Sequence, residues 1–414
     1  MATAGDSMYG AADAAATRRY ASGFWIVTYA YLIVMAFATL PSPLYGLYRT
    51  RDNLSAFTIT VVFAIFAAGS IAALLAVPSL AARLGRRGVM LTAVATMVAS
   101  AGLLAAWKAL PGLLIGRLIT GIAVGLAAGT AITYLIELSL GANPNASVVR
   151  ARTIGTAVTV GALGFGPLLA GFLAQWAGNP LTVPYLLVVA LGGIALIGLM
   201  SVPETATPAP SGPKRRALIP VPAATATVAA FAANGLFAGL SGLLLATTFN
   251  DHSHALAGAT LFIVFTAGVA SQFATGNLRA SRVLGVGTLS MLAGLTLLVV
   301  SLRLSTPSLA LFLISGALGG AGAGAVFKGT TGLVIAAAPE DRLALTSQLL
   351  IALYFGLSIP VIGAGIALDR GASTSNTVLG FAIVVGLGVA GAGWQLLAGR
   401  KSASTPTKSG KVKT

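Results

Sequence analysis

The chain has 414 residues, of which 57% are hydrophobic and only 8% are charged, and its mean hydropathy is +0.92. Soluble domains carry about a quarter charged residues, so this composition excludes an ordinary soluble protein and indicates an integral membrane protein. The absence of Cys excludes disulfides and thiolate metal sites, and the formal net charge of +16 sits in loops and a tail, not on a surface suited to nucleic acid.

Apolar segments of membrane-spanning length follow one another along the chain. Each is about the ~20 residues that a helix needs to cross the hydrocarbon layer. We expect twelve transmembrane helices, at 24–47, 57–77, 89–108, 111–137, 153–176, 183–203, 224–248, 256–276, 283–303, 308–337, 344–368 and 377–399. The predicted fold class is therefore all-α, with every helix in the membrane.

The segments outside these spans divide the chain into five parts. Residues 1–22 lack the features of a signal peptide and are predicted to be a cytoplasmic N-terminal arm. Residues 204–223 are rich in Pro around Lys214-Arg215-Arg216 and cannot continue a helix, so they are predicted to link two halves. The expected parts are the arm 1–22, a six-helix half 23–203, a cytoplasmic linker 204–223, a second six-helix half 224–399 and a basic cytoplasmic tail 400–414.

Most of the 25 Lys and Arg residues fall in alternate loops, on the side of the two termini and the linker. Loops rich in Lys and Arg stay in the cytoplasm. This bias predicts an even number of spans in the cell (plasma) membrane, with both termini cytoplasmic.

A weak internal repeat supports two equivalent halves. Arg150 and Arg342 each precede a span, and Pro167 and Pro360 each interrupt the span that follows, at nearly the same separation. Six-plus-six repeats of this kind are common in secondary carriers.

A short basic turn at residues 78–88, Pro-Ser-Leu-Ala-Ala-Arg-Leu-Gly-Arg-Arg-Gly, separates the second and third spans. It resembles the loop signature of the major facilitator superfamily, Gly-x-Leu-Ala-Asp-Arg-x-Gly-Arg-Arg. The matching positions are Leu80, Ala81, Arg83, Gly85, Arg86 and Arg87. Pro78 replaces the Gly of the pattern and Ala82 replaces its Asp.

Further segments resemble elements of the same family in the expected order. They are Gly116-Arg117-Leu-Ile-Thr-Gly121, Gly166-Pro167-Leu-Leu-Ala170-Gly171, and Val202-Pro203-Glu204-Thr205 at the end of the sixth span. The resemblance implies two pseudo-symmetric six-helix halves. It also implies a helix-bend motif at Gly166, Pro167 and Gly171, with Pro360 as its counterpart in the second half.

The resemblance further implies a conformational latch made by the basic turn, with Arg83, Gly85, Arg86 and Arg87. In the family an Asp of the turn caps a helix and pairs with a loop Arg, and Ala82 removes that carboxylate. Glu137 is the nearest candidate to supply the missing anion. The alternative is that Glu137 is an interfacial anchor whose carboxylate reaches water.

Arg117 is the most informative single residue, because it lies in the outer third of a span that is otherwise uncharged up to Glu137. An ionisable group there costs about 2.5–3.5 kcal/mol on insertion scales and normally faces a cavity or a partner. We expect Arg117 to lie on the transport path. The alternative is that it binds backbone carbonyls of a neighbouring helix.

Other polar residues within the spans are weaker candidates. Lys328 either faces a cavity or reaches the cytoplasmic surface. Tyr31, Asn234, Gln272 and Gln348 are predicted to line a transport path, although each could instead join helices together. His252 and His254, beside Asp251, are expected in an exposed outer loop.

These observations predict a secondary active transporter that moves a small organic solute by alternating access, as the family resemblance implies. The fifth-span element resembles the antiporter form and favours proton-coupled export of lipophilic or drug-like compounds. A metabolite importer or facilitator is the alternative, because no carboxylate lies in mid-membrane. A non-transporting sensor or scaffold is the alternative of another class. We expect no enzymatic activity, no cofactor, no metal site and no nucleic-acid partner. The expected partners are the solute, protons if transport is coupled to them, and the lipid bilayer. The expected oligomeric state is a monomer.

Overall fold

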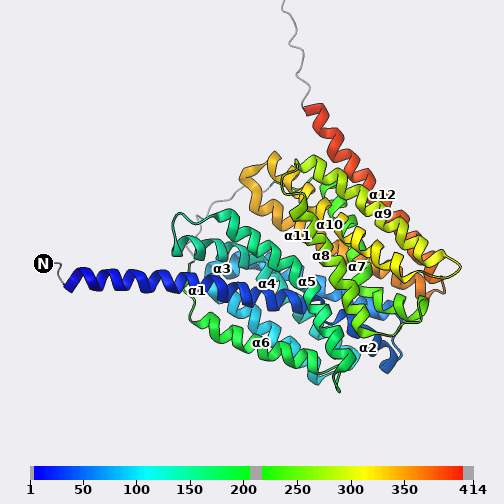
Figure 1. Ribbon diagram of the computed structural model, residues 1–414, viewed down its shortest axis with the longest axis horizontal. Coiled ribbons are helices and arrows are strands. Elements are labelled where there is room, and N and C mark those ends of the chain that lie inside the picture. Colours follow the sequence, from blue (N-terminus) through cyan, green and yellow to red (C-terminus); the bar gives the residue numbers. More distant parts are fainter. Residues whose placement is uncertain (1–3, 206–216, 404–414) are drawn as a thin grey trace, which may run out of the picture.

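The computed structural model describes residues 4–205 and 217–403, and within these ranges its regular structure is entirely helical (Figure 1). The α-helices are α1 (Ala4–Thr39), α2 (Tyr45–Asp52), α3 (Ala56–Ala106), α4 (Leu110–Ala142), α5 (Val148–Trp176), α6 (Val183–Met200), α7 (Val221–Thr248), α8 (His254–Ala274), α9 (Ala280–Arg303), α10 (Leu309–Ala337), α11 (Arg342–Asp369) and α12 (Thr374–Ala403). Two short 3₁₀ helices are η1 (Ser42–Leu44) and η2 (Pro339–Asp341).

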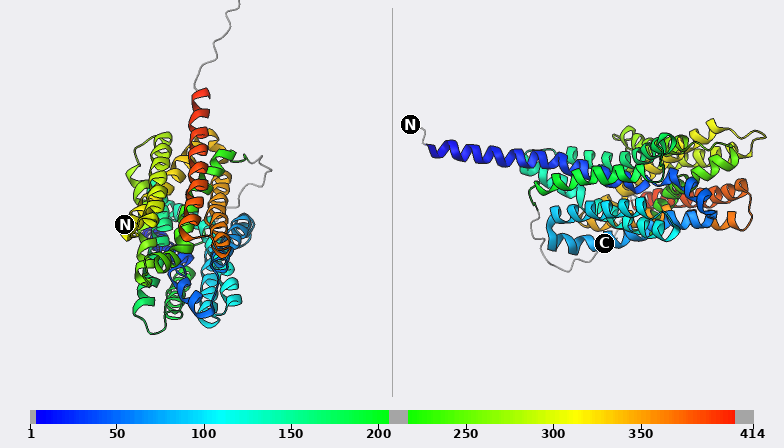
Figure 2. Two further views of the ribbon diagram at one scale, coloured as in Figure 1. Left: turned by 90° about the vertical axis from the view of Figure 1, so that its right-hand side faces the viewer. Right: turned by 90° about the horizontal axis from the view of Figure 1, so that it is seen from below.

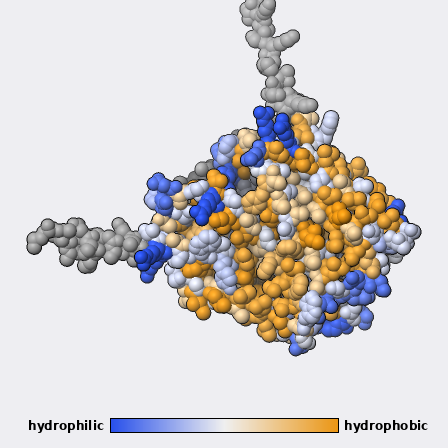
Figure 3. Space-filling model, in the orientation of Figure 1, coloured by the Kyte–Doolittle hydropathy of each residue, from blue (hydrophilic) through white to orange (hydrophobic). Residues whose placement is uncertain are grey.

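Eleven helical segments in the described ranges are long and apolar enough to cross a membrane, and α3 contains two of the expected spans. The all-helical architecture with twelve spans is therefore confirmed. Figure 2 shows the helices running roughly alongside one another as a bundle. On the face in Figure 3, apolar residues cover the middle and hydrophilic residues gather towards opposite margins, as expected of a protein surrounded by lipid.

The first span differs from the prediction of a single helix over 24–47. α1 ends at Thr39, and the chain continues through η1 into the separate helix α2. Pro41 and Pro43 are the physical reason, because proline has no N–H to donate and clashes with the preceding turn. At the other end α1 begins at Ala4, so the described part of the predicted arm is helical and continuous with the first span.

The basic turn lies inside α3, where Gly85 breaks the helix with φ of 72° and ψ of 178°. Contacts with α4 show that the chain reverses there. Before Gly85, Phe66 and Val77 lie beside Gly121 and Gly129 respectively, so this arm runs parallel to α4. After Gly85, Ser100 donates its hydroxyl proton to the Gly116 carbonyl at 2.7 Å and Leu104 lies beside the same glycine.

The second half repeats this arrangement. Gly320 and Gly324 of α10 lie against the backbone of Val264 and Gly268 in α8, as Gly121 and Gly125 of α4 lie against Phe66 and Ser70 in α3. In lipid the hydrophobic effect does not drive helices together, so small residues that let backbones approach closely supply the packing. The two halves therefore have equivalent cores built on paired glycines four residues apart.

The prolines within α5 and α11 do not interrupt their helices. α5 runs from Val148 to Trp176 through Pro167, and α11 runs from Arg342 to Asp369 through Pro360. The expected interruption of both spans is thus wrong. Neighbouring helices can compensate for the missing proline hydrogen bond inside a membrane bundle. Lys214, Arg215, Arg216 and residues 404–414, which the charge argument used, lie outside the described residues.

Replacement of Gly85 by Ala should destabilise the protein. Its backbone conformation is one that residues with a Cβ rarely adopt, at a cost of about 1–3 kcal/mol, and a Cβ would also meet the Glu204 carboxylate. Gly102→Ala, in the helical second arm of α3 where a Cβ meets nothing within 4 Å, is the matched control. Thermal unfolding of the purified variants should show a lower midpoint for Gly85→Ala alone; equal midpoints would contradict the argument.

Candidate functional site

The two halves meet along α5 and α8, and their backbones touch where glycines occur. Gly171 lies against the His254 carbonyl, and Gly258 lies against the Pro167 carbonyl. Beyond these glycines, Oε1 of Gln175 accepts a hydrogen bond from the backbone N–H of His254 at 2.9 Å. This end of the molecule also carries α2, and we call it the α2 end; the halves are closed together there.

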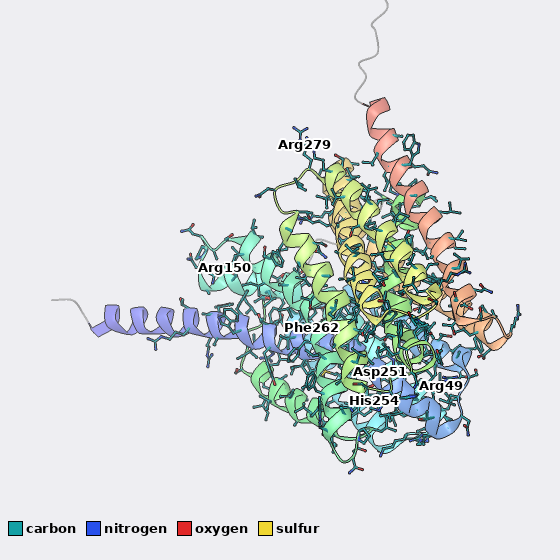
Figure 4. The ribbon with its side chains drawn as sticks, turned by 45° about the vertical axis from the view of Figure 1, so that its right-hand side comes forward. Arg49, Arg150, Asp251, His254, Phe262 and Arg279 are labelled. Atoms are coloured by element: carbon teal, nitrogen blue, oxygen red, sulfur yellow. The ribbon has the colours of Figure 1, made fainter. Side chains whose placement is uncertain are left out.

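The opposite ends of α5 and α8 lie apart. In Figure 4, Arg150 at the start of α5 and Arg279 just before α9 are widely separated, whereas α8 approaches α5 near Phe262 and His254. We call this the linker end, because residues 217–219 enter α7 there. Along α5 and α8 the structure is thus asymmetric, because these helices are in contact at the α2 end and apart at the linker end.

A second contact between the halves joins α3 to α11. The rings of Phe66 and Tyr354 pack edge to face with centroids 5.7 Å apart, and the Ser358 hydroxyl donates to the Ala64 carbonyl at 3.5 Å. Gly365 lies against Thr60, one helical turn closer to the α2 end. Together, α5 with α8 and α3 with α11 form the interface between the two halves.

Uncharged polar groups gather on the helices beside this interface. Tyr31 of α1 and Thr159 of α5 share a hydrogen bond of 2.7 Å between their hydroxyls. The side-chain oxygen of Asn234 in α7 is buried without a hydrogen-bond partner. A few polar groups on an apolar wall are typical of a small-molecule site. Tyr31 and Asn234 are the two predicted path residues that lie here, and sequence reasoning missed Thr159.

Arg117 is completely buried and lies inside the first half. Its Nη1 donates to the Ala38 carbonyl at 2.9 Å, and its guanidinium lies 4.8 Å from the centroid of the Phe66 ring. Ala38 is in the last turn of α1, where Pro41 ends the helix and leaves carbonyls without an internal partner. Arg117 therefore donates to a backbone carbonyl at the end of α1. This is the contact expected if Arg117 binds carbonyls of a neighbouring helix and does not lie on the transport path.

Two further nitrogens of Arg117, Nε and Nη2, are buried without a partner. Phe66 links the guanidinium to Tyr354 across the interface, so Arg117 lies one side chain away from the second half. Its place on the transport path stays a prediction, and its observed contacts are those of a residue that braces α1, α3 and α4.

Lys328 and Gln272 lie together at the end of α8. The Lys328 ammonium donates to the Gln272 carbonyl and lies 3.4 Å from the Thr275 hydroxyl. A cation at a helix C-terminus is stabilised by the exposed carbonyls there. Lys328 thus caps α8 from α10, and Gln272 contributes its backbone to that contact.

Gln348 lies at the linker end, away from Tyr31 and Asn234. Its Oε1 accepts from the Ile219 N–H at 3.1 Å and its Nε2 donates to the Ala217 carbonyl at 2.9 Å. The Asp341 carboxylate accepts from the Ala217 N–H at 3.3 Å. Gln348 and Asp341 therefore fix the chain as it enters α7.

The basic turn makes the contacts of a clamp within the first half. Nε of Arg86 lies 3.4 Å from Oε1 of Glu137, so the expected ion pair is present, although this nitrogen lacks hydrogen-bond geometry. Glu137 also accepts a hydrogen bond from the Thr205 hydroxyl at 2.6 Å. The role of these residues as a latch between conformations stays a prediction.

Glu204, which sequence reasoning passed over as an anion for the turn, makes the more direct contact. Its two carboxylate oxygens accept the backbone N–H groups of Arg86 at 2.7 Å and Arg87 at 3.0 Å. These N–H groups begin the second arm of α3, where a carboxylate is favoured by the helix dipole. The Pro203-Glu204 sequence after the sixth span is the feature that could have indicated this contact.

Comparison with known proteins agrees with this architecture. A family model described as "Sugar (and other) transporter" matches residues 15–207, which is less than half of the chain. The nucleoside transporter NupG is similar in structure, with a TM-score of 0.64 and 13% identity over 92% of this chain and 99% of that chain. A point mutant of NupG gives a TM-score of 0.66 and 12% identity over 91% and 99% of the two chains.

The chain has the fold of the major facilitator superfamily. At these identities the likeness to solved structures establishes the fold alone. No curated protein matches the sequence significantly. The family model covers the first half, in which the basic turn, the Arg117 element and the Gly166-Pro167 element all lie.

Arg117→Ala should lower the unfolding free energy by about 1–3 kcal/mol, because the Ala38 carbonyl loses its donor in a buried site. Arg117→Lys should recover part of this loss, since an ammonium can still reach one carbonyl. Thermal unfolding combined with solute flux per folded molecule separates the two roles. If Arg117 braces the helices, Arg117→Ala should have lower stability and normal flux per folded molecule. If Arg117 lies on the transport path, the variant should lose flux with unchanged stability.

Glu204→Gln should destabilise the turn more than Glu137→Gln does. An amide can accept only one of the two N–H groups that the Glu204 carboxylate binds, which costs about 1 kcal/mol. The Arg86–Glu137 pair is partly exposed and contributes about 0–1 kcal/mol. Denaturation midpoints of the two variants check this order, and a larger effect of Glu137→Gln would reverse the assignment.

Proposed function

We propose that the protein is a secondary active transporter that moves a small organic solute by alternating access. The observation that carries this proposal is the asymmetric contact of the two halves. α5 and α8 are closed together at the α2 end and apart at the linker end, while α3–α11 forms the second line of contact. Rocking of two repeats about a fixed central site is how such folds transport.

The orientation predicted from the charge bias places the linker end in the cytoplasm. On that prediction, the structure corresponds to the state that is open to the cytoplasm. The uncharged groups of Tyr31, Thr159 and Asn234 are then the residues best placed to hold a solute between the halves.

Export of lipophilic or drug-like compounds remains the first candidate for the direction of transport. It is supported by the resemblance of the Gly166-Pro167 element to the antiporter form. In the structure Gly166 lies against the Ala36 carbonyl, so this element sets how closely α5 approaches α1. Proton coupling is the weaker part of this candidate. In the described ranges, each Asp and Glu beyond residue 50 lies near a helix end or in a connection, so a proton site would need a different group.

A facilitator or importer of a polar metabolite is the second candidate, and the uncharged polar groups beside the interface favour it. The names of the similar proteins, a sugar transporter model and a nucleoside transporter, agree with a solute that carries hydroxyl groups. Hydroxyl and amide side chains supply the donors and acceptors that such a solute needs.

Counterflow into proteoliposomes tests the function and separates the candidates. The test solutes are a hexose, a nucleoside and a lipophilic cationic dye, each with and without a pH gradient. Uptake of the dye that depends on the gradient supports proton-coupled export, and gradient-independent exchange of the hexose or nucleoside supports the second candidate. Monodisperse, folded protein that exchanges none of them would favour the non-transporting sensor or scaffold.

Tyr31→Phe should slow transport about 2- to 10-fold, because it removes one hydrogen bond beside the interface and leaves the ring in place. Tyr29→Phe is the matched control: on the same helix, the Tyr29 hydroxyl donates to the Leu191 carbonyl of α6, on the outer side of the half. The measurement is the exchange rate per folded molecule for the best solute found. Equal effects of the two substitutions would remove Tyr31 from the site.

A further inference from the structure

The first turn of α8 is held by a residue of the other half. Oε1 of Gln175, in the last turn of α5, accepts hydrogen bonds from the backbone N–H of His254 at 2.9 Å and from the Ser253 hydroxyl at 3.4 Å. The first four N–H groups of a helix have no partner within the helix and need one from elsewhere. Gln175 therefore caps α8 across the boundary between the two halves.

The register of α5 against α8 brings Gln175 to this position. Gly258 lies against the Pro167 carbonyl. Gly171 lies against the His254 carbonyl. Pro167, Gly171 and Gln175 are four residues apart, so they share one face of α5. Because the two glycines let the backbones touch, the amide of the next turn of α5 reaches the end of α8 directly.

Other groups at this end of α8 find their partners within the second half. Oγ of Ser253 accepts the Leu256 N–H at 3.1 Å, and Oδ1 of Asp251 accepts the Ser253 N–H at 2.8 Å. Of these three N–H groups, only that of His254 has its partner in the first half. The cap across the boundary is therefore added to a helix start that its own half already holds.

The opposite end of α8 is capped in a different way. There the Lys328 ammonium of α10 donates to the Gln272 carbonyl, and both residues belong to the second half. That contact does not depend on where the first half lies. The Gln175–His254 hydrogen bond requires that α5 and α8 be closed together at the α2 end, where Figure 4 shows His254 beside α5. One cap of α8 is thus internal to its half, and the other depends on the conformation.

We propose that Gln175 is a positioning residue of the transport cycle, which latches the α2 end by capping α8 from the first half. A contact that is made in one conformation only shifts the population towards that conformation. Separation of the halves at the α2 end breaks the bond and leaves the His254 N–H to water. Gln175 therefore stabilises the conformation seen in the structure over one that is open at the α2 end. This consequence rests on the proposed alternating access.

Two substitutions remove the hydrogen bond from opposite sides. Gln175→Leu removes the acceptor and keeps a side chain of similar size. His254→Pro removes the donor at the first position of α8, where proline is well tolerated. Ser253, with ψ of 117°, already has the extended backbone that a residue before proline adopts. His254→Ala is the reference for His254→Pro, because it removes the imidazole and keeps the N–H.

Thiol labelling reports opening of the α2 end, because the chain contains no Cys of its own. Ala257 is 3% exposed and lines a cavity of about 390 Å³ between the halves at this end. Ala257→Cys therefore has room for a sulfur and is shielded while the end is closed. Ala101→Cys, at a fully buried position of α3 within the first half, is the control that reports unfolding. Each full-length variant is reconstituted in lipid nanodiscs and labelled with N-ethylmaleimide.

We expect Gln175→Leu to speed the labelling of Ala257→Cys about 2- to 10-fold. This range corresponds to the net contribution of one hydrogen bond for which water competes, since Gln175 is exposed. Gln175→Glu should not speed labelling, because a carboxylate also accepts the N–H and is favoured at a helix N-terminus. His254→Pro should speed labelling by a similar factor relative to His254→Ala. The double variant should match Gln175→Leu alone, because both substitutions remove the same bond.

Unchanged labelling of Ala257→Cys in Gln175→Leu, or additive effects in the double variant, would overturn the proposal. Labelling of Ala101→Cys should stay slow throughout. If it speeds up together with that of Ala257→Cys, Gln175 holds the fold and not the conformation, and the proposal is wrong. These measurements need no transport. Labelling that supports the latch in a protein that exchanges no solute would count against the proposed function and not against the latch.

Discussion

The structure depends on one constraint: a polar group in hydrocarbon must find its partner within the protein. Arg117 donates to the Ala38 carbonyl in the last turn of α1, where the helix ends. Lys328 does the same for the last turn of α8. Each of these intramembrane cations meets a helix end, so in both halves charge is placed where the helical hydrogen-bond pattern stops.

A second feature of the bundle is that glycines let neighbouring helices approach closely, alongside the buried apolar side chains of the core. Gly121 and Gly125 bring α3 and α4 together within the first half, and Gly320 and Gly324 do the same for α8 and α10 in the second. Between the halves, Gly171 and Gly258 bring α5 against α8. Many such contacts join the helices within each half, whereas a few helix pairs join the two halves, and this arrangement suits the rocking that we propose.

The contacts between halves differ in kind at the two ends of the molecule. Near the α2 end they include the Gln175–His254 hydrogen bond and the contact of Gly171 with the His254 carbonyl. At the linker end, the turn around Gly85 is tied by Glu204 and Glu137 to its own half, and Gln348 ties the linker to the second half. The contacts of the turn thus lie within the first half and would persist during the rocking that we propose.

The sequence by itself determined the spans, their number and the two-half layout, because apolar length and loop charge act locally and need no knowledge of partners. It also indicated that Glu137 pairs with an arginine of the basic turn, and the structure shows that this arginine is Arg86. Only the tertiary structure decided that Pro41 ends α1 early, that Glu204 holds the turn, and that Gln348 binds the linker. Each of these depends on which helix lies beside another. Because the membrane-spanning helices are all apolar, hydropathy carries no information about that choice.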